Sequence, residues 1–465
     1  MSEEIPTEIN FPDSMDLRAI KATSEPTMKA EFLEFQSQNQ TYGQREKIKI
    51  PISNTANTWL HGNDSFLSGR FKLTGALHPG GSISIDGTAF SLFKNARLLQ
   101  NNVPIVEQIE CGRNWNALFD FQVGHNDRYS KQISHCVAEN NFVLMNPTLF
   151  GTKIVNNKYV YFSICLPMSI VGSLSEKSFP LGSLNTGFVL ELDVEDLTKM
   201  ITTRAPNNTE FGMQSATTGL TLGKIEIDQI IYHAKVTNVG IYNSVLMSSL
   251  GTSFVIPGVE YIHDHRDVPS GTSSISANFS FPVKSAKSIM FWFTNSETAT
   301  GTEKNNKLNN AITQRSMGGN MKEYQISVDG KNFPQQPIKT DSGSTITDNN
   351  FEGVNGSIPF ANLLRCFNMN SSSSGGGVLT QVLYSSAEND WDSDSSRTKR
   401  TILGIDLDRG SNDNDKYFQG MNLMNSTTSI RCVWNTAATE PQTLYAYVMH
   451  DVSFLIQNGY VVVIR

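Results

Sequence analysis

The sequence predicts an all-β protein with two sandwich domains in tandem, and three observations lead to that prediction. From about residue 45 onward the chain consists mostly of short alternating or apolar runs separated by Gly, Asn, Asp and Ser. Hydrophobic residues make up 38% of the chain, which is enough for a sizeable core and excludes disorder over the full length. The length of 465 residues suits two large β domains, because one sandwich often spans about 200–250 residues.

The first 44 residues differ from the rest of the chain. They contain Pro6, Pro12 and Pro26 and few β-branched runs, which predicts an N-terminal arm over residues 1–44 without a core of its own. Within this arm, residues 31–35 (EFLEF) could attach it to a neighbour. A partly ordered terminus and a functional tether are both consistent with this composition.

We expect the first domain over residues 45–246. Its strands are predicted from period-two alternation or from short apolar runs at residues 47–50, 82–85, 160–164, 188–192, 224–228 and 230–239. Residues 105–121 carry apolar side chains at near-helical spacing, which predicts one or two short helices. Trp59 and Phe66 are expected in the core of this domain.

We expect the second domain over residues 247–465. Its predicted strands lie at residues 254–257, 259–262, 274–281, 288–293, 324–328, 401–407, 429–433, 444–456 and 459–464. Residues 359–367 predict a short helix with Pro359 in its first turn. Residues 288–293 are apolar on both faces, which predicts a strand buried on two sides. The expected core residues of this domain are Phe281, Ile289, Phe291, Trp292, Phe293 and Tyr324.

The predicted strands and loops together specify the fold further. Each half has about eight strands and one short helical insertion, and long polar segments connect them at residues 295–310, 341–350, 371–377 and 390–396. Two tandem eight-stranded jelly rolls, with short helical insertions and long polar loops, are the natural all-β architecture for this strand count. The absence of a short-period repeat in the sequence argues against a solenoid or propeller.

Charge and cysteine content limit the partners and the compartment. The chain has 37 basic and 44 acidic residues, a net charge of −7, and only a short basic cluster at residues 397–400, so we expect no direct sequence-specific contact with nucleic acid. The acidic start predicts no secretory signal, and no apolar run is long enough for a spanning helix. The five scattered cysteines are expected to be free thiols in a reducing cytosol or nucleus.

The sequence predicts no catalytic, cofactor-binding or metal-binding residue, and therefore no enzyme. The densest ligand-type cluster, residues 263–267 (HDHRD), is expected to be a polar loop at a strand end because no third group of ligands accompanies it. Asp390, Asp392 and Asp394 have the spacing of a calcium loop but lack its glycine, and residues 406–415 fail the same test. Nucleophile-elbow, phosphate-loop and dinucleotide motifs are also missing from the sequence.

Three segments resemble one family of viral proteins, in order and spacing. Residues 57–67 (NTWLHGNDSFL) resemble the opening of the first jelly roll in major capsid proteins of polinton-like viruses and adintoviruses. Residues 280–293 (SFPVKSAKSIMFWF) and 323–334 (EYQISVDGKNFP) resemble two segments of that family's second jelly roll. The resemblance covers most of residues 45–465 and not the arm.

This resemblance implies a double jelly-roll major capsid protein, in the lineage that includes the adenovirus hexon. Such proteins form homotrimers that act as pseudo-hexameric capsomers and tile an icosahedral shell. The implied partners are the chain itself, neighbouring capsomers, penton and minor capsid proteins, in a virion assembled inside the host cell; an internal membrane stays open. The alternative is a secreted or virion adhesin that binds glycans by stacking on Trp391 or Trp434. A third alternative is a β-sandwich lyase or hydrolase, although the sequence pairs no carboxylates, and no His with a nucleophile, for such chemistry.

Overall fold

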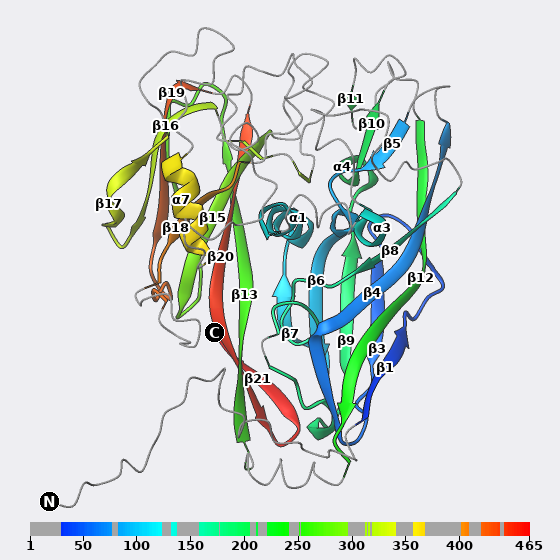
Figure 1. The fold of residues 1–465 in the computed structure, drawn as a ribbon. Coiled ribbons are helices and arrows are strands. Elements are labelled where there is room, and N and C mark those ends of the chain that lie inside the picture. The colour runs from blue at the N-terminus through cyan, green and yellow to red at the C-terminus, as the bar shows by residue number, and fades with distance from the viewer. Residues whose placement is uncertain are drawn as a thin grey trace, which may run out of the picture.

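In the residues that the structure describes, the strands pair into five antiparallel sheets, three in the first half of the chain and two in the second (Figure 1). The structure is a computed structural model. It describes residues 29–76, 82–122, 132–136, 158–175, 177–204, 211–212, 221–240, 251, 253–295, 312–313, 315–316, 319–340, 357–367, 401–408, 420–437 and 441–465.

The first half contains two facing four-stranded layers. One layer, called sheet A, has the strand order β1 (Lys29–Gln36), β12 (Thr221–Asn238), β4 (Thr58–Ala76) and β8 (Tyr159–Ile164), with β2 (Thr41–Tyr42) added on β12. The other layer, sheet B, has the order β3 (Lys47–Ile52), β9 (Phe188–Val194), β6 (Phe93–Gln100) and β7 (Val103–Gln108). A small third sheet joins β11 (Phe211–Gly212), β10 (Ile201–Arg204) and β5 (Ser82–Ile85).

The second half has the same plan. Sheet D has the order β13 (Ser253–Val268), β20 (Gln442–Gln457), β15 (Ala286–Asn295) and β18 (Leu403–Asp406), and the last strand, β21 (Tyr460–Ile464), pairs with the end of β20. Sheet E has the order β14 (Ser274–Phe279), β19 (Thr428–Ala437), β16 (Gly319–Val328) and β17 (Lys331–Lys339).

The strand order identifies both halves as jelly rolls. If the eight main strands of each half are numbered along the chain, one layer reads 1-8-3-6 and the other reads 2-7-4-5, in both halves. Each half also places its longer helix between the fifth and sixth strands, as α1 (Cys111–Gln122) in the first and α7 (Ser357–Cys366) in the second. The predicted fold class of two tandem eight-stranded jelly rolls with short helical insertions is confirmed. The four long loops predicted from the sequence fall almost wholly outside the described residues.

Three expectations about the first half need correction. Strand β1 lies inside the predicted arm, yet it pairs with β12 along its whole length and supplies the first of the eight strands, so the first jelly roll begins well before residue 45. Trp59 and Phe66 are only half-buried, whereas their neighbours Leu60 and Leu67 are fully buried in the core. The alternation of side chains along a strand places adjacent residues on opposite faces, and the sequence did not reveal which face was inward. Residues 105–108, predicted as helical, are part of β7.

The expected core of the second half is observed. Phe281, Ile289, Phe291, Trp292, Phe293 and Tyr324 are all fully buried in one apolar cluster. Strand β15 is buried on both of its faces, as its sequence predicts. Each half also contributes side chains to the core of the other. Phe454 and Ile456 of β20 pack into the core of the first half, and Leu118 and Phe121 of α1 pack into the core of the second half.

Candidate functional site

In the described residues, buried charged and hydrogen-bonded side chains gather at the junction between the two jelly rolls. Helix α1 lies between the halves, next to β20 (Figure 1). The Arg113 guanidinium on α1 is buried and lies 4.7 Å above the ring of Tyr445, while its Nε is 3.5 Å from the Glu110 carboxylate. The Tyr447 hydroxyl donates a 3.0 Å hydrogen bond to the Glu110 carbonyl. The outer face of sheet D is therefore fitted to the β7–α1 edge of the first half.

Two acidic residues of the first half find their partners in the second half. The Asp120 carboxylate on α1 accepts a hydrogen bond from the Arg315 guanidinium, and both side chains are buried. The Asp86 carboxylate accepts two bonds from Thr313, one from its backbone N–H at 2.8 Å and one from its hydroxyl at 2.6 Å. Removing one member of a buried charge pair is strongly destabilising, so these contacts resist separation of the halves.

A second contact lies at the opposite end of the junction. Strands β20 and β21 turn at Asn458–Gly459, where both residues have positive φ as a tight hairpin requires. The Gln100 side chain of β6 accepts a 2.8 Å bond from the Val461 N–H and donates a 3.3 Å bond to the Gly459 carbonyl. The Asn185 amide donates a 2.7 Å bond to the Asn458 carbonyl. The C-terminal hairpin is thus fastened to the first jelly roll.

Two buried titratable groups lie near this contact. Burial raises the pKa of Glu260 on β13 to about 8, although Arg465, whose guanidinium is 3.9 Å away, acts in the opposite direction. Burial lowers the pKa of His450 on β20 to about 4. Both residues are consequently neutral at pH 7, as expected for side chains enclosed between packed strands.

Several large apolar side chains remain exposed in the described residues. One group lies on sheet A and includes Phe32 of β1, which is 54% exposed, and Tyr161 of β8. A second group contains Val255 of β13 and Val462 of β21, which are exposed and both lie directly across from the half-buried Leu455 of β20. Exposed apolar patches of this kind are typical of surfaces that meet other proteins.

The sequence cluster at residues 263–267 lies inside β13 and not in a loop, so that expectation was wrong. The His263 ring stacks on His265 at 5.5 Å and lies 4.8 Å from the Tyr447 ring, as part of the junction. Burial lowers the pKa of His263 to about 3, and electrostatic repulsion from the nearby His265 is a second, smaller cause. No group of three or more His, Cys, Asp or Glu residues that could hold a metal ion occurs in the described part of the chain. The aspartates at 390, 392 and 394 lie outside it.

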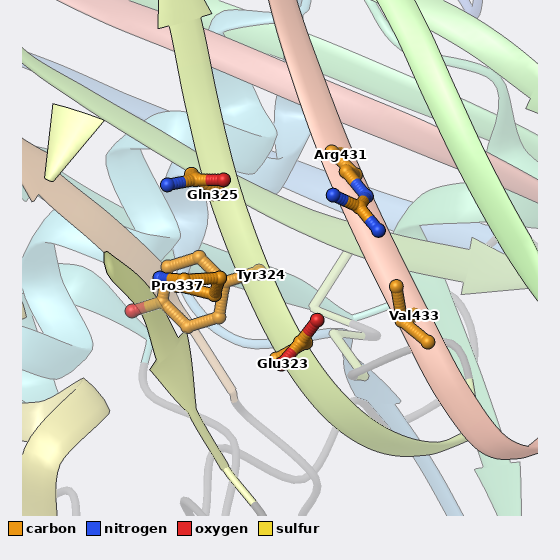
Figure 2. A pocket seen from close by; sticks show the side chains of 6 residues that line it. All are labelled: Glu323, Tyr324, Gln325, Pro337, Arg431 and Val433. Carbon is orange, nitrogen blue, oxygen red and sulfur yellow. The ribbon is translucent and has the colours of Figure 1, made fainter. Parts of the chain in front are cut away.

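A small surface depression lies on sheet E. It has about 140 Å³ of empty space, open solvent included, and is lined by Glu323, Tyr324, Gln325, Pro337, Arg431 and Val433 (Figure 2). Ligand sites usually have volumes of roughly 300–1,000 Å³. This depression is therefore too small to be a ligand site of the usual kind.

The structure excludes one of the two tryptophans that the glycan-binding alternative requires. Trp434 is buried and packs edge-on against Phe293, with 5.4 Å between ring centroids, so its face cannot receive a sugar. Trp391 lies outside the described residues, as does the basic cluster at residues 397–400. The five cysteines are free thiols, as predicted, and four of them are buried. None of the helices in the described residues has the length and apolar character needed to cross a membrane.

Comparison with known proteins shows what this architecture resembles. No protein-family description and no curated protein sequence matches the chain. Solved structures do match it over nearly its whole length. PBCV-1 VP54, in a structure fitted into a reconstruction of the virophage Sputnik, superposes with a TM-score of 0.56 at 12% identity, covering 94% of this chain and 97% of that one.

The major capsid proteins of mavirus and Faustovirus both match with a TM-score of 0.51, at 9% and 8% identity. The match to the mavirus protein covers 100% of this chain and 96% of that protein. The match to the Faustovirus protein covers 92% of this chain and 90% of that protein. The chain has the double jelly-roll fold. The wider lineage suggested by the sequence, which includes the adenovirus hexon, stays a prediction.

Proposed function

We propose that the chain is a major capsid protein whose homotrimers form pseudo-hexameric capsomers and tile an icosahedral virus shell. The observation that supports this most strongly is the match of both jelly rolls, in one chain and over nearly full length, to the major capsid proteins of mavirus and Faustovirus. The sequence resemblance described above points independently to the same class of protein.

The proposed function is assembly and not chemistry. Obligate interfaces commonly bury about 2,000–5,000 Å², and about 25 cal/mol per Å² of apolar area then gives a gross driving force of tens of kcal/mol. Association entropy and polar desolvation offset much of this free energy. Contacts between capsomers must be weaker than contacts within them, so that misplaced capsomers can dissociate.

Two properties of the chain suit this role. Charged residues are only 17% of the sequence, as is common where much surface becomes a protein interface. The junction is a buried and hydrogen-bonded contact, which supports the two jelly rolls entering the capsomer as one block. The proposed partners are other copies of the chain, neighbouring capsomers, and penton and minor capsid proteins, within a virion and without sequence-specific contact to nucleic acid.

The proposal is tested by the size and shape of the purified full-length protein. Light scattering is expected to give three times the mass of one chain, and electron micrographs are expected to show capsomers with a pseudo-hexagonal outline. A stable monomer under assembly conditions would contradict the proposal. A monomer that also shows carbohydrate specificity on a glycan array would favour the adhesin instead.

A further inference from the structure

The two jelly rolls present equivalent surfaces, and among the residues that the structure describes one pair of these surfaces is joined within the chain. Inside the chain, the outer face of sheet D receives the β7–α1 edge of the first jelly roll. The equivalent surfaces are the outer face of sheet A and the β17–α7 edge of the second jelly roll, since the strand order repeats. In the described residues, β17 pairs only with β16, and β1 pairs only with β12, so both strands are sheet edges.

The face of sheet D that the first jelly roll covers, and the outer face of sheet A, share an aromatic row. On sheet D, Tyr445 lies directly across from His265 of β13 and Trp292 of β15. On sheet A, His233 of β12 lies across from Phe66 of β4, whose ring stacks on it at 4.5 Å, and Phe32 of β1 lies 6.1 Å from Phe66. The row on sheet D meets Arg113 of the first half, whereas Phe32 remains 54% exposed.

The β17–α7 edge has the chemistry to cover this row. Ile358 in the first turn of α7 is 45% exposed and supplies an apolar contact. Lys331 and Lys339 at the two ends of β17 are exposed, as is Arg365 of α7. The sheet A face offers the Glu34 carboxylate, which is largely exposed and lies 3.5 Å from His233. Lys235, directly across from Phe32, is already paired with Asp64 at 2.7 Å, so Glu34 is the acidic group that a basic partner can meet. The two surfaces are therefore complementary in apolar character and in charge.

We propose that the β17–α7 edge of one copy docks on the outer face of sheet A of a second copy, with Ile358 near Phe32 and the basic side chains of the edge near Glu34. This inference rests on the proposed capsomer and names its contact surface. The occupant is a second copy, because the chain itself shows how such an edge seats on such a face. The contact joins two different surfaces, so it must either close into a ring or continue as a filament. Three copies close the ring of six jelly rolls.

The test is chemical cross-linking between introduced thiols in the full-length protein. Phe32→Cys and Ile358→Cys change exposed side chains, and a Cys165→Ser background removes the one native thiol that is not buried. Chains with Phe32→Cys are co-expressed with chains that carry Ile358→Cys and treated with a short bismaleimide. We expect cross-linked dimers from the mixture and none from either variant alone. A chain that carries both substitutions should give products of two and three copies and no larger ones.

The matched control is Ser276→Cys on β14, an exposed position at the other edge of sheet E. Its mixture with Phe32→Cys should give no product. Self-linking of Phe32→Cys alone, product with Ser276→Cys, or a ladder beyond three copies would overturn the proposed contact. Trimers by light scattering without any link from Phe32→Cys to Ile358→Cys would overturn the contact and leave the capsomer standing. A protein that remains monomeric would overturn both.

Discussion

The buried ion pair between Asp120 and Arg315 gives the sharpest prediction about the junction. Both side chains are fully enclosed, and they come from different jelly rolls. In Arg315→Met the Asp120 carboxylate stays buried without its cation, which typically destabilises a protein by about 3–5 kcal/mol. The entropy of unfolding is about 2.1 cal/mol/K per residue, so 465 residues that unfold together correspond to roughly 1 kcal/mol per degree. We therefore expect the Tm to fall by about 3–5 °C.

A double-mutant cycle separates loss of the pair from loss of packing. Asp120→Leu alone should be destabilising by a similar amount, because it leaves the guanidinium buried. The double variant Asp120→Leu with Arg315→Met should recover most of the stability, since apolar replacements of buried ion pairs are often neutral or better. The control is Arg45→Met, which removes the largely exposed partner of Asp196 beside sheet B and should change stability by less than about 1 kcal/mol. The measurement is thermal unfolding followed by calorimetry. Single variants with the melting temperature of the wild type would refute this reasoning. So would a double variant whose loss of stability equals the sum of the two single losses.

Three further predictions concern other buried groups. The folded state favours the neutral form of Glu260, so the contribution of this residue to stability is complete below about pH 4.5 and is lost as the pH rises toward about 8. In melting curves recorded over this pH range, Glu260→Gln should remove the decline. At pH 8 the variant should be more stable than the wild type by up to about 4 kcal/mol. Gln100→Ala leaves the Val461 N–H without its acceptor, which should cost about 1–3 kcal/mol and speed hydrogen exchange in the β20–β21 hairpin. Trp292→Asp buries an unpaired charge beneath the junction and should abolish soluble trimer, and a normal particle yield would contradict the strand assignment.

Local patterns were sufficient to predict most strands. Period-two alternation located β14, and an apolar run located β15, because in both cases the signal lies within one element. Long strands were predicted in pieces. Strand β12 was divided near residue 229, where Gln229 has positive φ and the pairing with β4 shifts register, which is a bulge within one continuous strand. Pro257 did not end β13, because β13 is an edge strand and can lack an N–H there.

The junction could not be predicted in the same way. Asp120 and Arg315 are 195 residues apart, and nothing local to either residue indicates its partner. Helix α1 also gave no such signal: its sequence CGRNWNALFDFQ contains Arg113, Asn114, Asn116 and Asp120, which are typical of a solvent-facing side, yet all four side chains are buried. Trp292 was correctly expected to be buried, but it lies on the face of sheet D that meets the first jelly roll, with its ring 4.9 Å from Tyr447.

Joining two jelly rolls in one chain changes the free energy of making a ring of six. Six separate modules would lose the translational and rotational freedom of five particles, whereas three double modules lose that of only two, and each loss costs about 4–15 kcal/mol. The contacts within the chain can then be rich in buried polar pairs such as Asp120–Arg315, which fix one geometry during folding. In the proposed capsomer, the contacts between chains would form in solution from exposed surfaces, for which side chains that tolerate water, such as Phe32, Ile358 and the charges around them, are suited. The difference between the two kinds of contact, built on equivalent strands, is what we expect of a module that was duplicated and then divided between folding and assembly.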